Sequence, residues 1–314
     1  MTQGRTEGAR RLHTLTLESA YAECRGIAKR EAKNFYYAFI ALPPRRRNAI
    51  CAIYAFMRMA DDLADDESLS RPERRRRLDA WLSDWRGVCH GGDTSNPVFL
   101  AVRDAVEHFQ IPLSLLDELI AGVTMDLDPP ADGKTDTYAT FAELYRYCYL
   151  VASVVGLVCI CIFGYQDQHA EKLAEKTGIA FQLTNILRDV AEDAERNRIY
   201  LPLEDLAEHG VTVEGLLQRA PGTPPTDAER ALLMAVTERA EYFYKSAMEL
   251  LPLIDAESRP ALWVLVSIYH ALLLRIKKAD YDVFTQRVSV PTTEKLRILM
   301  VGLVRMGFAR LFVH

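Results

Sequence analysis

Apolar residues recur at helical spacing along most of the chain. After Pro44 they follow one another at intervals of three or four positions, as in Ile50, Ile53 and Met57. This spacing places them on one face of an amphipathic helix. The same pattern predicts further helices near these ranges: 138–164, 168–194, 227–250, 256–280 and 292–311.

Start signals mark three more helices. Ser70 and Glu73 have the spacing of a capping box, so a helix is predicted to begin there. Pro97 and Pro112 stand where two others are expected to start. No alternating strand pattern of useful length accompanies them.

The polar loops at 126–134 and 220–225 are too short to separate domains. We therefore expect an all-α protein, a single-domain bundle of roughly ten to twelve helices around a central apolar helix. Residues 1–16 contain no apolar core of signal-peptide length and are expected to form a flexible tail. Residues 17–291 would form the main domain, and an amphipathic helix at 292–314 would continue it.

One stretch, from Tyr147 to Tyr165, contains no charged residue. Its length approaches what is needed to span a bilayer. The stretch also contains polar and small residues, and a helix that is apolar all round can equally lie at the centre of a soluble bundle. We favour the buried helix.

The composition is that of an ordinary globular protein. Of 314 residues, 49% are hydrophobic and 26% charged, and the formal net charge is −5. Bulk positive charge for nucleic-acid binding is absent, so no nucleic-acid partner is expected. The six cysteines show no C-x-x-C spacing, which favours buried, reduced thiols and a cytoplasmic location.

Two carboxylate clusters suggest the chemistry. Asp61 and Asp65 are four positions apart and share a helix face. Asp189 and Asp193 repeat that spacing, and Gln182 and Asn185 extend the stripe in the other direction. Opposed carboxylate pairs would bind Mg²⁺, which prefers oxygen ligands and shares them with substrate phosphate. Metal-bound diphosphate is a good leaving group, and the carbocation left behind would need an aromatic, water-free pocket.

Two other interpretations of the acidic residues fit the sequence less well than a Mg²⁺–diphosphate site. A carboxylate-bridged di-iron site needs Glu-x-x-His pairs, and no Glu has a His three positions later. Either acidic cluster alone could also be a solvated helix face. Two such clusters beside apolar helices favour the metal–diphosphate site.

The motifs around these clusters resemble those of the squalene and phytoene synthase family. Tyr54–Asp66 (YAFMRMADDLADD) resembles the first aspartate-rich motif, and Phe181–Asp193 (FQLTNILRDVAED) the second. Tyr147–Gly156 (YCYLVASVVG) resembles the central helix motif, and Arg198–Pro202 (RIYLP) follows the second aspartate motif. The resemblance extends from about residue 17 to about 291.

Membership would imply an all-α, Mg²⁺-dependent enzyme that joins two prenyl diphosphates head to head. The implied metal ligands are Asp61, Asp65, Asn185, Asp189 and Asp193. The implied contacts to the diphosphates are Lys33, Asn34, Tyr54, Arg58, Gln182, Arg188 and Tyr269. Tyr147 would serve the first half-reaction through proton handling or cation stabilisation. The residues expected to line the prenyl channels are Phe35, Phe39, Val151, Ala152 and Val155.

Two positions depart from the family pattern. Asn34 stands where a Ser is usual, and an amide can still donate to phosphate. Ser153 replaces a usual Gly in the central helix. Its extra atoms would either shorten a prenyl channel or shift a helix contact.

The product is less determined than the family. Members join farnesyl diphosphate to presqualene diphosphate, continue to squalene with NADPH or to dehydrosqualene without it, or make phytoene from geranylgeranyl diphosphate. Local stretches resemble the bacterial presqualene diphosphate synthases: Asn34–Phe39, Met125–Leu127, Phe163–Asp167, Asp282–Phe284 and Arg287–Ser289. We favour farnesyl diphosphate, with phytoene synthesis as the alternative. NADPH would be needed only if the reaction continues to squalene.

Two other functions fit the sequence less well than head-to-head condensation. A non-catalytic family member would be expected to lose aspartates from one cluster, and both clusters are complete. A Mg²⁺-dependent terpene cyclase would share the clusters, but the Tyr147 motif argues against it.

The C-terminal segment 295–314 is basic and apolar and contains no acid. Such a helix can lie on an anionic bilayer, here the inner face of the membrane, or pack on the bundle as its last helix. Downstream isoprenoid enzymes are the expected partners beyond the prenyl diphosphate substrates.

Overall fold

The predicted helices are present, and several begin at the residues that mark helix starts. The computed structural model describes residues 15–66, 68–125, 127 and 135–311, without the side chains of Lys33, Asn34, Asp136 and 306–311. Pro44 and Pro97 are the first residues of their helices. Asn96 caps the second of these, its Oδ1 accepting from the backbone N–H of Val98 at 2.9 Å.

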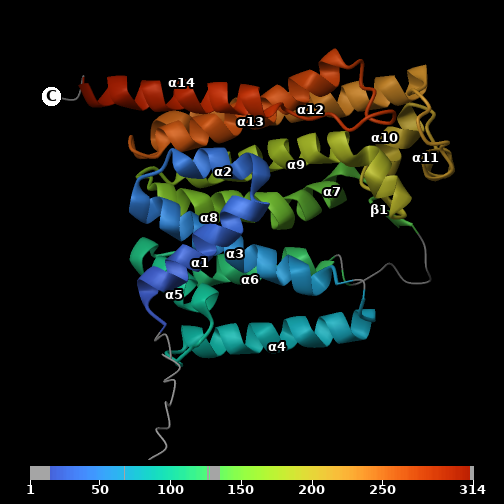
Figure 1. Cartoon of the computed structure of the whole chain (residues 1–314). Coiled ribbons are helices and arrows are strands. Elements are labelled where there is room, and N and C mark those ends of the chain that lie inside the picture. The colour runs from blue at the N-terminus through green and yellow to red at the C-terminus, as the bar shows by residue number, and fades with distance from the viewer. Residues whose placement is uncertain (1–14, 67, 126, 128–134, 312–314) are drawn as a thin grey trace, which may run out of the picture.

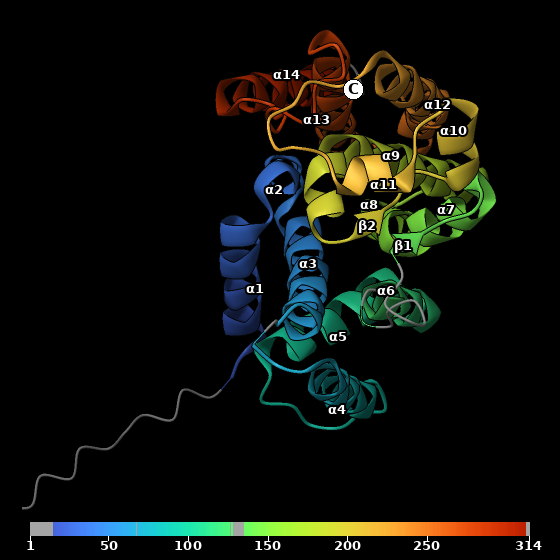
Figure 2. The same ribbon diagram turned by 90° about the vertical axis from the view of Figure 1, so that its right-hand side faces the viewer.

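Helices of the first half of the chain stack around one another. They are α1 (Leu17–Glu31), α2 (Lys33–Ile40), α3 (Pro44–Ala64), α4 (Arg71–Cys89), α5 (Pro97–Phe109) and α6 (Leu113–Met125). Helix α3 packs on α1, α5, α4 and α6, so it is the centre of this half. Figure 2 shows α1 and α3 side by side, with α4 at the lower edge.

The second half forms a larger group of helices. Its elements are α7 (Phe141–Cys148), η2 (Tyr149–Ser153), α8 (Val154–Phe163), α9 (His169–Glu195), α10 (Leu203–Glu208), α11 (Val213–Leu217), α12 (Asp227–Leu250), η3 (Leu251–Leu253), α13 (Arg259–Lys278) and α14 (Thr292–Leu311). Helix α9 packs on α12, α8 and η2. Figure 1 shows α9 in the interior and α14 on the outer edge.

The all-α prediction is confirmed. The described residues form fourteen α-helices rather than the ten to twelve expected. The short helices α10 and α11 have too few turns to show a period in the sequence. The central apolar helix is also divided, because a turn of π-helix, η2, separates α7 from α8.

This central helix, predicted near 138–164, extends over Phe141–Phe163. Its α8 part packs on α9, α6 and α3, which joins the two halves of the bundle. Phe141–Phe163 and Arg259–Lys278 are each long and apolar enough to cross a membrane by length and composition. In their most apolar stretches, 50% and 61% of the residues are buried, as is also common in the core helices of a bundle. Length and composition alone therefore do not show that either helix spans a membrane.

The packing of η2 against its neighbours is close. A Cβ on Gly178 of α9 would lie 2.5 Å from Cα of Ser153, and one on Gly122 of α6 would lie 3.0 Å from the carbonyl oxygen of Leu150. The Ser153 hydroxyl donates to the carbonyl oxygen of Glu175 at 2.6 Å and is fully buried. Of the two effects expected of Ser153, the structure shows a helix contact with α9.

The capping box predicted at Ser70 is wrong. Ser70 precedes α4, but its side chain makes no capping hydrogen bond. Glu73 instead accepts from Arg76 Nη2 at 2.7 Å and Arg77 Nε at 3.1 Å, so its carboxylate is neutralised on the helix surface. A capping box that was not predicted joins Thr226 and Glu229 at the start of α12.

Two short strands were also not predicted. β1 (Asp136–Thr137) pairs in parallel with β2 (Arg198–Ile199). Two residues cannot show an alternating pattern, which is why the sequence does not reveal them. Their pairing brings the segment before α7 beside the segment after α9.

A polar corner ties three distant segments together. Arg46 of α3 donates to the carbonyl oxygen of Phe163 at 2.6 Å, to Oγ of Ser258 at 2.6 Å and to Oδ2 of Asp255 at 2.7 Å. At Gly164 the backbone has φ of +79°, and a Cβ there would lie 2.1 Å from Asp255 Oδ2. Only glycine fits this turn.

Candidate active site

The first carboxylate pair lies at the C-terminal end of α3. Asp61 is half-buried in the last turn, and Asp65 is the exposed residue that caps it. The backbone N–H of Asp65 donates to the carbonyl oxygen of Asp61 at 2.8 Å. A helix C-terminus carries partial negative charge, so two carboxylates there are unfavourable unless a cation joins them.

Tyr54 and Arg58 precede this pair on the same helix. Arg58 forms an ion pair with Asp62. Burial raises the pKa of the Tyr54 hydroxyl to about 12, against the opposing charge of Arg58. The Tyr54 ring meets that of Phe39 of α2 edge-on, with centroids 6.1 Å apart.

The second pair lies on the interior helix α9, on the predicted polar stripe. Nδ2 of Asn185 donates to Oε1 of Gln182 at 3.3 Å. Oδ1 of Asn185 is buried, with no hydrogen-bond partner. One turn later, Asp189 accepts from Arg188 Nε at 2.8 Å.

Asp193, the last residue of the stripe, has a partly buried carboxyl group whose pKa is raised. Burial raises the pKa of its carboxyl to about 7, and the negative charge of Asp189 adds to the shift. Arg196 and Arg198 oppose the shift. The positive charges of Arg196 and Arg198 thus offset only part of this shift, whereas Asp189 forms direct ion pairs with Arg188 and Arg287.

Arg287, for which no role was predicted, reaches the second pair from the segment after α13. Its Nη2 lies 2.8 Å from Oδ1 of Asp189 and its Nη1 lies 3.0 Å from Oε1 of Glu192. The side chain is 51% exposed, so it can rearrange without breaking the core. Its signal in the sequence was only its place in the Arg287–Ser289 stretch.

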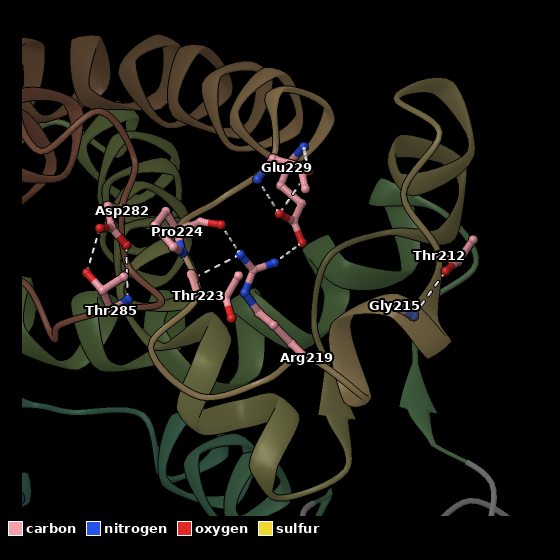
Figure 3. A network of polar contacts seen from close by, with 9 residues as sticks. Thr212, Gly215, Arg219, Thr223, Pro224, Glu229, Asp282 and Thr285 are labelled. Carbon is pink, nitrogen blue, oxygen red and sulfur yellow. Dashed lines mark hydrogen bonds and ion pairs between the residues drawn. The ribbon is translucent and has the colours of Figure 1, made fainter.

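The segment that carries Arg287 is fixed by contacts shown in part in Figure 3. Asp282 accepts from the backbone N–H of Thr285 at 3.0 Å. The Phe284 ring lies 3.9 Å below the guanidinium of Arg219, which pairs with Glu229 and donates to the Thr223 carbonyl at 3.0 Å. The capping box of α12 thus positions a loop that ends at the second pair.

Tyr147 lies in a cluster of three tyrosines. Its ring is buried and stacks on Tyr200 with centroids 4.9 Å apart and planes 22° apart. Tyr138 lies 5.5 Å from Tyr147 and 6.1 Å from Tyr200. Strands β1 and β2 end directly before Tyr138 and Tyr200, so their pairing builds this cluster.

The tyrosine cluster adjoins the second pair. A small cavity has walls that include Ile186, Asp193, Arg198 and Tyr200. Tyr147 also directly precedes the last residue of α7, so the π turn η2 begins two residues later. Single π turns inside α-helices are frequent at functional sites, because they re-aim the side chains around them.

Comparison with known proteins identifies the family. A model described as squalene/phytoene synthase matches residues 28–294. The chain belongs to the squalene/phytoene synthase family. Head-to-head condensation of prenyl diphosphates is the reaction of this family.

The individual relatives include both phytoene synthases and synthases named for squalene or dehydrosqualene. A 15-cis-phytoene synthase of Synechocystis sp. is 34% identical, over 92% of this chain and 86% of its own length. A crystallised dehydrosqualene synthase is 30% identical with a TM-score of 0.81, covering 93% of this chain and 98% of the other. The squalene synthase HpnC from Alicyclobacillus acidocaldarius is 26% identical with a TM-score of 0.75, covering 85% and 96%.

The apolar residues predicted to line the prenyl channels of a squalene/phytoene synthase lie on α2, η2 and α8. Phe39 is buried and Phe35 half-buried on α2. Val151, Ala152 and Val155 are half-buried on η2 and α8. Phe181 of α9, which was not assigned a role, stacks on Tyr269 of α13.

Tyr269 is the residue that links the two motifs. Its ring is 5.5 Å from Phe35 and 4.4 Å from Phe181. Burial raises the pKa of its hydroxyl to about 12, while the nearby charge of Arg188 opposes the shift. The negative charge of Asp189 adds to the upward shift of the pKa.

Lys33 and Asn34 begin α2, but their side chains lie outside the described part of the structure. Their expected contacts with diphosphate therefore stay predictions. The backbone of α2 does place both residues next to Phe35, on the helix that packs against α13.

The donor set fits Mg²⁺ bound together with substrate. Among the described residues, no three Asp, Glu, His or Cys side chains gather closely enough to hold a metal ion by themselves. Asn185 Oδ1, however, is a buried oxygen without a partner, and the raised pKa of Asp193 marks a carboxylate whose charged form a cation would stabilise. Mg²⁺ characteristically takes one or two carboxylates and fills its remaining positions with phosphate oxygens and water.

Proposed function

We propose that this protein joins two molecules of farnesyl diphosphate head to head, releasing diphosphate and forming presqualene diphosphate. The observation that carries the proposal is the placement of Tyr269, whose ring contacts Phe35 and Phe181 while its hydroxyl is influenced by Arg188. Charged groups for diphosphate and an aromatic wall for a prenyl chain thus meet at one residue.

Mg²⁺ would be held by Asp61 and Asp65 from α3 and by Asn185, Asp189 and Asp193 from α9. When bound, it neutralises the charge that develops on the leaving diphosphate. Arg58 and Arg188 would bind phosphate oxygens, with Lys33, Asn34 and Gln182 beside them. Arg287 can exchange its bonds to Asp189 and Glu192 for a phosphate, because its side chain is half-exposed.

The chain's own residues then control the cation. Phe35, Phe39, Val151, Ala152 and Val155 would exclude water from the prenyl chains. Aromatic faces stabilise nearby positive charge. Closing the cyclopropane ring releases one proton, and Tyr147, which stacks on Tyr200, would pass that proton on or stabilise the cation before the proton leaves.

Local sequence resemblance and similar solved structures both support the choice of farnesyl diphosphate. Five local stretches resemble bacterial presqualene diphosphate synthases, and the solved structures similar to this chain include a dehydrosqualene synthase and a squalene synthase. The second candidate is phytoene synthesis from geranylgeranyl diphosphate. It is favoured by the names of the curated relatives, including phytoene synthases of Synechocystis sp. and Arthrospira platensis that are 34% and 35% identical.

Product analysis decides between them. Purified protein would receive Mg²⁺ with farnesyl or geranylgeranyl diphosphate in separate reactions, each with and without NADPH. Presqualene diphosphate from farnesyl diphosphate in both arms supports the proposal. Squalene only with NADPH would move the end point one step further, and phytoene from geranylgeranyl diphosphate alone would overturn the farnesyl assignment.

We infer a cytoplasmic location for this reaction from the reduced, unpaired cysteines. All six are free in the structure, and Cys24, Cys51 and Cys148 are buried. Buried thiols without disulfides suit a reducing compartment. Downstream isoprenoid enzymes would take up the apolar product.

A further inference from the structure

Helix α14 has two apolar faces, and only one of them packs on the bundle. Ile298 and Leu299 are buried, and a Cβ on Gly302 would lie 2.5 Å from a methyl carbon of Val264 of α13. Arg275 of α13 donates from Nε to Glu294 at 3.0 Å, which fixes the start of α14. One of the two expectations for this segment, packing as the last helix, is thus what the structure shows.

The opposite face is apolar and exposed. Leu296, Met300 and Val304 recur every four residues and are 47%, 59% and 52% exposed, and Val301 beside them is 42% exposed. We call these four residues the outer stripe. A surface helix normally presents polar residues to solvent, so an outer face of this kind indicates a partner. Figures 1 and 2 both place α14 on the periphery of the molecule.

The charges around the outer stripe have one sign. From Lys295 to Arg305 the helix has three basic residues and no acid. Arg297 is exposed within the arc of the outer stripe, and Arg305 lies 4.3 Å above the ring of Trp263 at its edge. Glu294, the acid before this segment, is already paired with Arg275.

We propose that the outer stripe of α14 is a docking surface for an anionic lipid bilayer, on which the folded bundle lies peripherally. The apolar side chains would enter the acyl boundary, while Arg297 and Arg305 extend to the headgroups. A helix that lies in the interface needs such a pairing of apolar residues with flanking cations. The surface does not depend on which prenyl diphosphate the active site takes.

A second copy of the chain suits this surface less well. A two-fold dimer would place the same patch opposite itself and bring Arg297 of both copies into one apolar contact. No acid on the described outer face of α14 would neutralise them. Anionic headgroups supply the missing charge, and each basic residue near such a surface strengthens binding about five-fold.

Vesicle flotation of the full chain tests the proposal. Vesicles of phosphatidylcholine alone would be compared with vesicles that also contain about 30 mol% of the anionic lipid phosphatidylglycerol. The variant Leu296→Ser/Met300→Ser/Val304→Ser removes three of the four residues of the outer stripe without touching Ile298 or Leu299. Its matched control is Met248→Ser, a 60% exposed methionine on α12.

Charge is tested separately with Arg297→Glu, matched by Arg86→Glu on α4, whose side chain is 65% exposed. We expect the wild-type chain and both controls to float with anionic vesicles. Arg297→Glu should bind at least about five-fold more weakly, and the triple variant should stay with the soluble fraction. Circular dichroism and turnover of soluble substrate check that each variant is folded.

Wild-type protein that ignores anionic vesicles would overturn the proposal, as would equal binding by the triple variant. Sedimentation analysis tests whether a second copy of the chain, rather than a bilayer, covers the outer stripe. If the wild type is a dimer and the triple variant a monomer, the outer stripe is an interface between copies and the bilayer assignment is wrong.

Discussion

The ring of Tyr269 stacks on the ring of Phe181, with centroids 4.4 Å apart and planes 20° apart. This contact connects α13 to the start of the polar stripe on α9. On its other side Tyr269 lies 5.5 Å from Phe35 of α2. A single side chain of α13 thereby contacts aromatic rings of both α2 and α9.

Tyr269→Phe should keep the stack and lose the hydroxyl. If the hydroxyl contacts a diphosphate, its loss should lower kcat/KM by about 10- to 100-fold, since hydrogen bonds to charged groups contribute about 1.5–3 kcal/mol. The matched control is Tyr244→Phe, which loses a 3.0 Å contact with Thr184 instead. Steady-state kinetics that show equal effects of both changes would contradict the binding role.

Asp61→Asn and Asp189→Asn should each lower kcat/KM by at least about 100-fold, because each removes a charged metal ligand from the leaving-group site. In thermal unfolding, Asp61→Asn should show no loss of stability, because it removes a like-charge repulsion. Asp189→Asn should be somewhat less stable, because it weakens the ion pairs of Asp189 with Arg188 and Arg287. Asp79→Asn on α4, which forms a surface ion pair with Arg75, is the control. Near-normal turnover in either aspartate variant would refute the two-cluster site.

The raised pKa of Asp193 predicts a dependence of stability on pH. Its carboxyl has a pKa of about 7 in the folded chain and an ordinary value of 3.8. Between these values the folded state binds more protons than the unfolded state. The free energy of unfolding should therefore fall as pH rises from about 4 to about 7 in a chelating buffer.

Denaturant titrations of the wild type and Asp193→Asn measure this slope. The variant should lack this contribution. Mg²⁺ with diphosphate should also flatten the wild-type slope, because the ion favours the deprotonated carboxylate. Identical slopes for wild type and variant without metal would show that Asp193 titrates normally.

Tyr147→Phe should slow turnover more than it weakens substrate binding. General acid–base groups contribute about 10²–10⁴-fold, so kcat should fall by that order while KM changes little. Tyr149→Phe is a close control, because the Tyr149 hydroxyl donates to Glu118 at 2.8 Å and not to the tyrosine cluster. A raised KM with unchanged kcat would contradict the assigned role of Tyr147.

Regular spacing is what made much of this molecule predictable. The polar stripe from Gln182 to Asp193 follows from intervals of three and four on one helix, and α9 holds it as expected. The central apolar helix was also found within three residues of its predicted start at 138. In both cases the decisive contacts lie within one helix, where sequence distance fixes distance in space.

Contacts between distant segments could not be predicted in this way. Arg287 reaches Asp189 from 98 positions along the chain, through a loop that has no period. Tyr138 meets Tyr200 because two-residue strands pair, and these are too short to leave a pattern. The π turn at η2 was missed for a related reason, since its residues have the same apolar composition as the α-helices on either side.

Gly178→Ala should destabilise the fold, because the new Cβ would lie 2.5 Å from Ser153 Cα and 2.9 Å from the carbonyl carbon of Ala152. Both atoms are backbone and cannot turn aside, so α9 and η2 must separate. Overpacking of this kind costs about 1–3 kcal/mol of unfolding free energy. Gly87→Ala on α4 is the matched control.

A Cβ on Gly87 meets no atom within 4 Å, so that change should leave stability unchanged or raise it by about 0.5–1 kcal/mol. Because η2 begins two residues after Tyr147, Gly178→Ala should also lower turnover in the fraction that remains folded. Denaturant titration measures the first effect, and kinetics at low temperature measure the second. If Gly178→Ala is as stable as Gly87→Ala, the close approach of α9 to the π turn does not require glycine at position 178.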